Sequence, residues 1–191
     1  MNNFLESSAI IDWDCPAITA KADLLKHESE IETAKACFLY VRDEIRHSWD
    51  YQDTVVTLRA SDVLAHGTGY CYAKSHLLAA LLRANGIPAA LCYQRLSLEG
   101  NGAPYCLHGL NAVFLQGFGW HRIDARGNKA DVNAQFSPPN EQLAFPTQEE
   151  GESDIAGYYS SPLNTVIESL SQHSSVQALY ENLPDIEQPA L

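Results

Sequence analysis

Residues 66–88 read HGTGYCYAKSHLLAALLRANGIP, a glycine-rich turn that gives way to a strongly apolar segment. The apolar run predicts a buried helix from about Cys71 to Arg83. Gly86 tolerates the left-handed conformation that ends a helix, and Pro88 cannot continue one. Cys71 is therefore expected in the first turn of the helix, at its polar entrance rather than in its apolar middle.

A cysteine in that position is placed for nucleophilic chemistry. Backbone N–H groups in the first turn lack partners within the helix, and the helix dipole favours negative charge there. Both effects favour the thiolate, which is the nucleophile, and the same N–H groups could stabilise an oxyanion. Gly67 and Gly69 would keep the approach to the sulfur open. The alternative is that the glycines mark an ordinary loop and Cys71 is a small apolar filler.

The segments on either side predict an α+β fold. Apolar residues recur every three or four positions from about Glu28 to Trp49, which predicts an amphipathic helix, and ASDVLAHG predicts a shorter helix at 60–67. Helices that precede strands without βαβ alternation are typical of this fold class. Three segments rich in β-branched and aromatic residues predict an antiparallel sheet, at 88–98, 105–115 and 119–127.

The length of 191 residues predicts one compact domain followed by an appendage. We expect residues 1–145 to form the main domain, and residues 146–191 to form an acidic linker and a helical appendage packed on the same domain. The proline-punctuated acidic stretch 137–154 is expected to run over the surface. A further helix is predicted from Pro162, because apolar residues recur at helical spacing at Leu163, Val166, Ile167 and Leu170.

Composition and charge favour a soluble, cytoplasmic protein. The net charge of −12 argues against nucleic acid or an anionic membrane as the main partner. It would suit neutral or basic substrates, or serve solubility alone. We find no signal peptide and no apolar run long enough to span a membrane. The five cysteines form no C-x-x-C pair, which predicts free thiols in a reducing compartment, with Cys37 and Cys92 in the core. The sequence does not indicate an oligomeric state.

A nucleophilic cysteine needs a base, and the base needs an orienting acceptor. Among seven histidines, His108 opens a predicted strand, where a fold could bring it to the start of the helix. Asp124 lies on the neighbouring predicted strand. A hairpin that pairs Phe114 with Phe118 would set His108 directly opposite Asp124. Another register remains possible, and a histidine and an aspartate on adjacent strands are often ordinary surface residues.

Three segments together resemble the transglutaminase-like superfamily of papain-type cysteine enzymes. They are GTGYCYAKSHLLAALLRANGIPA, HGLNAVFL and WHRIDARGNK, and the resemblance covers about residues 40–135. It implies a papain/transglutaminase-like core, with the nucleophile at the N-terminus of a central helix that packs on an antiparallel sheet.

The resemblance also implies roles for individual residues. Cys71 would be the nucleophile, His108 the base and later the acid, and Asp124 the orienting acceptor. Many small prokaryotic members are regarded as peptidases or amidases, so a peptide or protein substrate is expected, with a small amide as an alternative. The animal transglutaminases are longer, multidomain and calcium-regulated. This chain has no EF-hand-like loop, so we expect neither calcium nor another metal or cofactor.

The residue that assists the oxyanion is not identified by the resemblance, because the upstream tryptophan of the animal enzymes has no clear counterpart here. Trp49, Tyr51 and Gln52 are candidates, since an indole, a phenol or an amide can each donate a hydrogen bond. Tyr70 and Tyr72 are candidates for lining a substrate groove. For all five residues the alternative is packing or loop structure.

Three other functions compete with amide hydrolysis through a thioester. Acyl transfer, as in a transglutaminase, would need a second docking site for an amine. A non-catalytic protein-binding module could retain the same fold. Zinc binding by Cys106 and His108, with Cys71 or His121, is a third alternative, although the spacing matches no familiar zinc pattern. We favour hydrolysis, because it needs only access of water to the intermediate.

Overall fold

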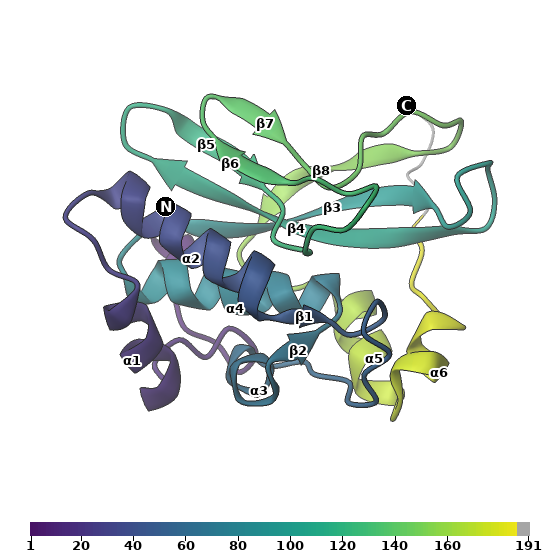
Figure 1. Cartoon of the computed structure of the whole chain (residues 1–191), viewed down its shortest axis with the longest axis horizontal. Coiled ribbons are helices and arrows are strands. Elements are labelled where there is room, and N and C mark those ends of the chain that lie inside the picture. The colour runs from purple at the N-terminus through teal and green to yellow at the C-terminus, as the bar shows by residue number, and fades with distance from the viewer. Residues whose placement is uncertain (187–191) are drawn as a thin grey trace.

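The computed structural model describes residues 1–186, and in it a layer of helices lies against one face of an antiparallel sheet (Figure 1). This is the α+β fold that the sequence predicts. The helices are α1 (Pro16–Leu24), α2 (Glu30–Glu44), α3 (Ala60–His66), α4 (Cys71–Ala84), α5 (Asn164–Gln172) and α6 (Val176–Tyr180), after a short 3-10 turn, η1 (Asn2–Phe4).

The main sheet has four strands in the order β5-β4-β3-β8, all antiparallel. A parallel pair, β1-β2, and a small hairpin, β6-β7, lie outside it. The strands are β1 (Arg46–His47), β2 (Thr68–Gly69), β3 (Ala89–Ser97), β4 (Tyr105–Leu115), β5 (Gly119–Ile123), β6 (Gln135–Ser137), β7 (Asn140–Gln142) and β8 (Ser153–Tyr159).

Helix α4 is the centre of the fold. Every residue from Cys71 to Arg83 is buried, because β3 and β4 cover one side of the helix and α1, α2 and α3 cover the other. The helix ends as expected, with Gly86 in the left-handed conformation. Burying one leucine side chain contributes about 1.5–3 kcal/mol. The fully buried leucines of α4 therefore anchor the residues at its start; they are Leu77, Leu78, Leu81 and Leu82.

The sequence left the register of the β4-β5 hairpin open, and the structure does not have the one that pairs Phe114 with Phe118. Phe114 pairs with Trp120 rather than with Phe118, and Asn111 pairs with Ile123. The connection is a three-residue loop, in which Gly117 has a φ of 88°. A three-residue hairpin loop needs a left-handed residue, and glycine supplies it without steric cost. Asp124 therefore follows the last paired residue of β5 and does not lie directly opposite His108.

The acidic stretch 137–154 does not simply run over the surface. It contains β7, and after this strand the chain turns inward, so that Ala144 is buried. At the end of the stretch, β8 begins at Ser153 and completes the sheet beside β3; the sequence did not predict this strand. Ile155 is the one residue of β8 that is buried, so the strand lacks a clear apolar alternation.

The C-terminal part packs on the helical side of the molecule. Helix α5 begins at Asn164, two residues after Pro162, and buries Val166 and Leu170. Helix α6 begins after Ser175, whose hydroxyl accepts a hydrogen bond from the Ala178 N–H. From α6 the chain rises past the ends of β3 and β4 toward the C-terminus (Figure 1).

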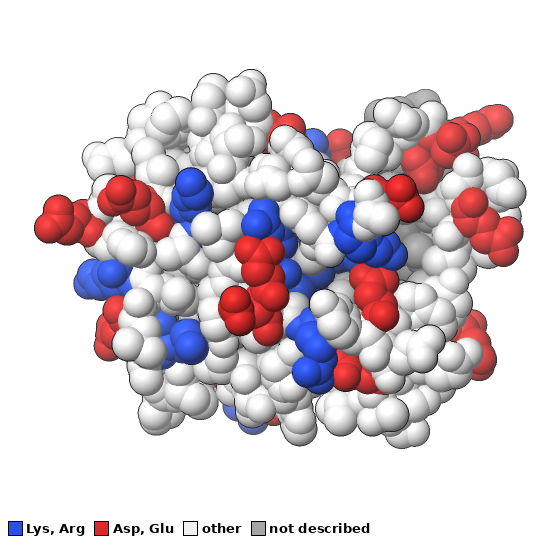
Figure 2. All heavy atoms as spheres, viewed as in Figure 1, with Lys and Arg blue, Asp and Glu red and all other residues white. Residues whose placement is uncertain are grey.

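On the face shown in Figure 2, acidic and basic side chains are interspersed, and no broad patch of one sign is visible. Within residues 1–186, no helix is both long enough and apolar enough to cross a membrane.

Candidate active site

Cys71 is the first residue of α4, and Tyr70 is the residue that precedes the helix. The Tyr70 side chain makes no capping hydrogen bond, so it leaves the first N–H groups of the helix without a side-chain acceptor at that position. The Gly109 N–H of β4 points at the Cys71 sulfur, with an N–S distance of 3.5 Å. The start of α4 and the middle of β4 therefore meet at this thiol.

His108 precedes Gly109 on β4 and forms a buried pair with Asp124. The His108 Nε2 atom lies 2.7 Å from Asp124 Oδ2, and the ring packs edge-on against Phe145 with centroids 5.1 Å apart. Burial disfavours the imidazolium, but the Asp124 carboxylate and a hydrogen bond with Cys71 favour it and raise the pKa of His108 above its ordinary value of 6.5. The imidazole thus links the thiol to the carboxylate.

Asp124 is completely buried and is held by the backbone on both sides. Its Oδ1 accepts from the Arg126 N–H at 3.0 Å, and its Oδ2 accepts from the Ala144 N–H at 3.1 Å. Burial alone would raise the pKa of Asp124, but His108 and these backbone hydrogen bonds lower it below its ordinary value. The inward turn at Ala144 therefore belongs to the site, a contribution that the acidic stretch gave no reason to expect.

A cleft of about 410 Å³ opens beside Cys71 and His108. Of the groove and oxyanion candidates, Trp49 and Tyr70 line it. Its other lining residues include His47, Cys106, Leu107, Arg126, Lys129, Phe145 and Tyr180.

The other three candidates lie outside this cleft. Tyr51 is 66% exposed, because the turn that carries it points outward. Gln52, with a φ of 53°, lines a neighbouring cavity. Tyr72 faces the core, where its hydroxyl donates to the Leu107 carbonyl. One residue along a helix rotates the side chain by about 100°, which separates Tyr72 from the cleft.

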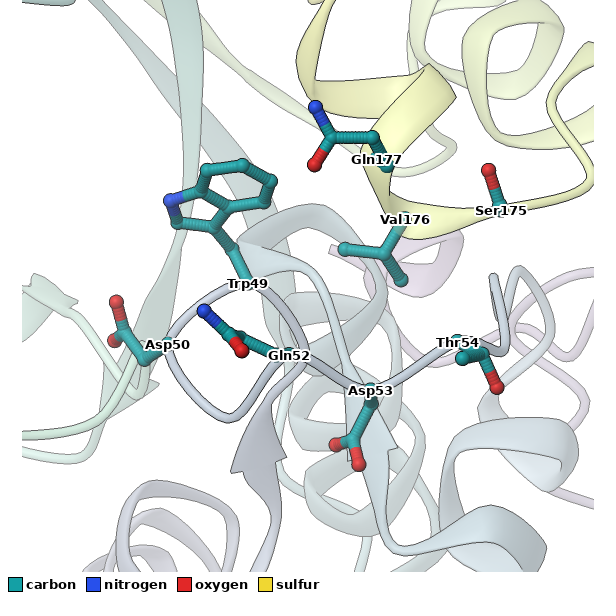
Figure 3. A pocket seen from close by; sticks show the side chains of 8 residues that line it. All are labelled: Trp49, Asp50, Gln52, Asp53, Thr54, Ser175, Val176 and Gln177. Atoms are coloured by element: carbon teal, nitrogen blue, oxygen red, sulfur yellow. The ribbon is translucent and has the colours of Figure 1, made fainter.

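The neighbouring cavity, of about 550 Å³, lies between the turn 49–54 and the start of α6 (Figure 3). Trp49 borders both spaces. The two carboxylates of this cavity are already paired, Asp50 with Arg126 at 2.6 Å and with Lys129 at 3.0 Å, and Asp53 with Arg46 at 2.9 Å. Arg126 holds the pKa of Asp50 at about 2 against the opposing effect of burial.

His47 is a cleft residue that the sequence analysis missed. Pairing of β1 with β2 places it beside Gly69, and its ring lies 4.9 Å from that of Tyr70. Its Nδ1 atom has no hydrogen-bond partner among the described residues and is 3.6 Å from Asp50 Oδ2. Burial and the nearby Arg126 lower the pKa of His47 well below its ordinary value, so the ring is neutral at physiological pH. A two-residue strand has no local sequence pattern that could have indicated this.

Metal binding finds no geometric support at Cys106 and His108. Within residues 1–186, no group of three or more histidine, cysteine or acidic side chains is arranged to hold a metal ion. Cys106 lines the cleft, but burial raises the pKa of its thiol to about 12. Cys37 and Cys92 are buried, as expected of core residues.

The arrangement is suited to nucleophilic chemistry. It places a thiol at a helix N-terminus, an imidazole that contacts the thiol, and a buried carboxylate that fixes the imidazole. The cleft beside them gives a reacting group access to the sulfur.

Comparison with known proteins gives a family match. The sequence model of the transglutaminase-like superfamily matches residues 18–125, a range that contains all three of these residues. Among solved structures, the chain is similar to one titled "Putative Cysteine Protease from Cytophaga hutchinsonii", with 21% identity and a TM-score of 0.49. That similarity covers 64% of this chain and 40% of the other. No curated protein matches.

Proposed function

The chain belongs to the transglutaminase-like superfamily, and we propose that it is a cysteine-dependent amide hydrolase with Cys71 as nucleophile, His108 as base and Asp124 as orienting acceptor. The observation that carries the proposal is the 2.7 Å contact between His108 and Asp124, next to a thiol at the start of α4. In a catalytic triad, a contact between the histidine and the aspartate holds the imidazole in the orientation that proton transfer needs.

In the first half of the reaction, the Cys71 sulfur attacks the carbonyl carbon of the amide. The C=O electron pair moves onto the oxygen, and the first N–H groups of α4 stabilise this oxyanion. His108, protonated at the expense of the thiol, then donates its proton to the amide nitrogen. The C–N bond breaks, the amine leaves, and the acyl group remains on Cys71 as a thioester.

In the second half, water replaces the amine. His108, now neutral, accepts a proton from the water as its oxygen attacks the thioester carbon. Collapse of the second oxyanion breaks the C–S bond and releases the carboxylic acid, which regenerates the Cys71–His108 pair. Asp124 keeps the imidazole aligned through both halves, because its carboxylate accepts from Nε2 and leaves Nδ1 for the reacting groups.

One reason to favour hydrolysis over acyl transfer is that the additional cavity that shares Trp49 with the cleft is poorly suited to a cationic amine. Its carboxylates, Asp50 and Asp53, already hold arginine and lysine partners. An amine would have to compete with these ion pairs for the same oxygens. Peptides and proteins are the proposed substrates, with a small amide as the alternative.

Product analysis tests the proposal. Purified protein is incubated with a peptide library, with and without a primary amine, and the products are identified by mass spectrometry. We expect new carboxylic acid ends in both cases, and none with Cys71→Ala. The variant Cys37→Ala, which alters a buried thiol remote from the cleft, serves as the control and should retain activity if it folds. If amine adducts dominated, the activity would be acyl transfer rather than hydrolysis. Products that persist in Cys71→Ala would refute the proposal.

A further inference from the structure

The last described residues of the chain lie next to the same cleft, against Leu107, which lines it. Residues 181–186, here called the C-terminal strap, follow α6 and run beside β4. The Leu107 N–H, one residue before His108, donates to the Pro184 carbonyl at an N–O distance of 2.7 Å. Pro184 is itself buried. The strap thus contacts the backbone directly next to the catalytic histidine.

This contact uses an edge of β4 that the sheet leaves open. The β4-β5 ladder ends where Asn111 pairs with Ile123, four residues after Leu107. The N–H and the C=O of one residue in a strand point the same way, and here the Leu107 C=O accepts from Tyr72 while its N–H reaches the strap. The Pro184 carbonyl therefore takes the place that an added strand would occupy.

Side chains fix the strap at two further points. Arg95 pairs with Leu107 across β3 and β4, and its guanidinium donates to both carboxylate oxygens of Asp185, at 2.7 and 2.6 Å. Tyr180, just before the strap, stacks on Trp49 with ring centroids 3.6 Å apart and lines the cleft. The strap is thus held by a backbone hydrogen bond and an ion pair, and the residue before it by an aromatic stack.

These contacts are the kind with which a protein holds an extended peptide. Main-chain hydrogen bonds to an open strand edge give affinity, and side-chain contacts select the sequence. Arg95 is preorganised for a carboxylate, since its guanidinium also lies over the Tyr105 ring at 3.9 Å and donates to the Gly151 carbonyl. The site would therefore take a peptide segment with an acidic residue at the position of Asp185.

We infer that the open edge of β4 at Leu107, with Arg95, is a substrate subsite for extended peptides carrying an acidic residue, and that the C-terminal strap is its resident occupant. The inference rests on the proposed function, because it assigns the substrate class of that site. A tethered occupant has an effective concentration in the millimolar range, so a substrate peptide must displace it. We therefore expect release of the strap to widen the cleft and to make Cys71 more accessible.

The test uses full-length protein and iodoacetamide, with alkylation of Cys71 followed by mass spectrometry. In Asp185→Arg the strap is repelled by Arg95, and we expect Cys71 to react roughly fivefold faster than in the wild type. Glu168→Arg makes the same charge change on the exposed side of α5 and should leave the rate unaltered. Equal rates in the two variants would overturn the inference.

A peptide added in trans supplies the second measurement. The peptide ENLPDIEQPAL, which has the sequence of residues 181–191, should slow alkylation of Cys71 in the Asp185→Arg protein, whereas the same peptide with arginine for the aspartate should not. Absence of protection, or equal protection by both peptides, would refute the subsite. Protection depends only on occupancy of the subsite beside the cleft. It can therefore be observed even if no amide is hydrolysed, in which case the proposed function alone fails.

Discussion

At the residue scale, His108 and Asp124 stabilise each other only within a limited range of pH. The pKa of His108 is raised above 6.5, so its contribution to folding is complete below about 6.5 and is lost as the pH rises through the folded-state pKa. The pKa of Asp124 is lowered below 3.8, so its contribution is present above that value and is lost as the pH falls through the folded-state pKa. Between the folded-state pKa values of the two groups, the Asp124 carboxylate and the His108 imidazole are both charged.

Replacing the Asp124 carboxylate should lower the pKa of His108. In Asp124→Asn the favourable charge is gone while burial remains, and only the interaction with Cys71 still favours the imidazolium, so we expect the pKa of His108 to fall. The measurement is a pH titration of the imidazole signals by NMR in the wild type and the variant. In the wild type, the His108 signal should still be that of the imidazolium at pH 7. An unchanged titration in the variant would show that Asp124 does not govern the charge of His108.

Lys74 is a buried lysine that makes the stability of the fold rise with pH, whereas the contribution of His108 is lost as the pH rises. It is fully buried, and its ammonium group donates to the Ile45 carbonyl. Burial and Arg126 lower its pKa from 10.5 to about 7. Between these two values the unfolded state binds more protons than the folded state, so stability should rise with pH from about 7 to about 10.

The variant Lys74→Met should remove that rise. The wild type is expected to gain up to about 1.4 kcal/mol per pH unit relative to the variant between pH 7 and pH 10. Urea unfolding at pH 7, 8 and 9 measures the difference, and Lys26→Met, at an exposed position, should run parallel to the wild type. If the free energy of unfolding of Lys74→Met changed with pH in parallel with that of the wild type, Lys74 would already be charged in the folded protein.

At the scale of elements, the approach of β4 to α4 depends on one glycine. A Cβ atom added to Gly109 would lie 2.9 Å from Tyr72 Cδ1 and 3.0 Å from Tyr72 Cα. The second of these atoms is backbone at the start of α4, so the strand itself would have to move. The contact between the Gly109 N–H and Cys71 depends on the same close approach.

Gly109→Ala should therefore weaken both stability and reactivity. We expect a loss of roughly 1–3 kcal/mol, as for overpacking of a dense core, together with slower alkylation of Cys71, since the site is pulled apart. Urea unfolding and mass-mapped alkylation of the same preparation measure the two effects. Stability and reactivity that both match the wild type would indicate that β4 and α4 do not pack as closely as described.

The elements differ in how far the sequence could predict them. Helix α4 was predicted to within a residue at its C-terminus, because its apolar residues run continuously up to a glycine–proline stop. The first long helix was predicted to reach Trp49 but ends at Glu44, because residues 46–47 pair with residues 68–69 as β1 and β2. That pairing is non-local and leaves no periodic signal, which is also why His47 was missed.

The site shows the same division. Cys71 was located from a local pattern, the glycine turn before an apolar helix, and it lies at the first residue of α4. The contact of His108 with Asp124 depends on a hairpin register that the sequence left open, and the register that would set the two residues directly opposite each other is not the one formed. The side chains meet nonetheless at 2.7 Å, because Asp124 continues past the paired part of β5 toward His108. No sequence pattern indicated the hydrogen bond from the Ala144 N–H to Asp124, because Ala144 lies in a segment of polar composition.

At the scale of the whole molecule, Arg83 joins segments that are far apart in the sequence. From the last turn of α4 its guanidinium donates to the carbonyls of Glu6, Ala89 and Ser160, at distances of 2.8–3.1 Å. Burial lowers the pKa of Arg83 to about 10, still far above physiological pH, so the cation persists. Its partners come from the N-terminal segment, from β3 and from the chain after β8. We therefore expect both ends of the described chain to unfold together with the core.

Arg83→Lys should be costly despite the retained charge. A lysine ammonium cannot reproduce the planar fork that reaches three carbonyls, and each buried carbonyl left unpaired costs about 1–3 kcal/mol. We expect a loss of at least about 2 kcal/mol, measured by urea unfolding with tryptophan fluorescence and far-UV circular dichroism, whose transitions should coincide. Arg46→Lys is the matched control, because the exposed Arg46 pairs with Asp53, which a lysine can also contact. If the two variants unfold at the same urea concentration, Arg83 does not hold these segments together, and non-coincident transitions in the wild type would show that the C-terminal part unfolds separately from the core.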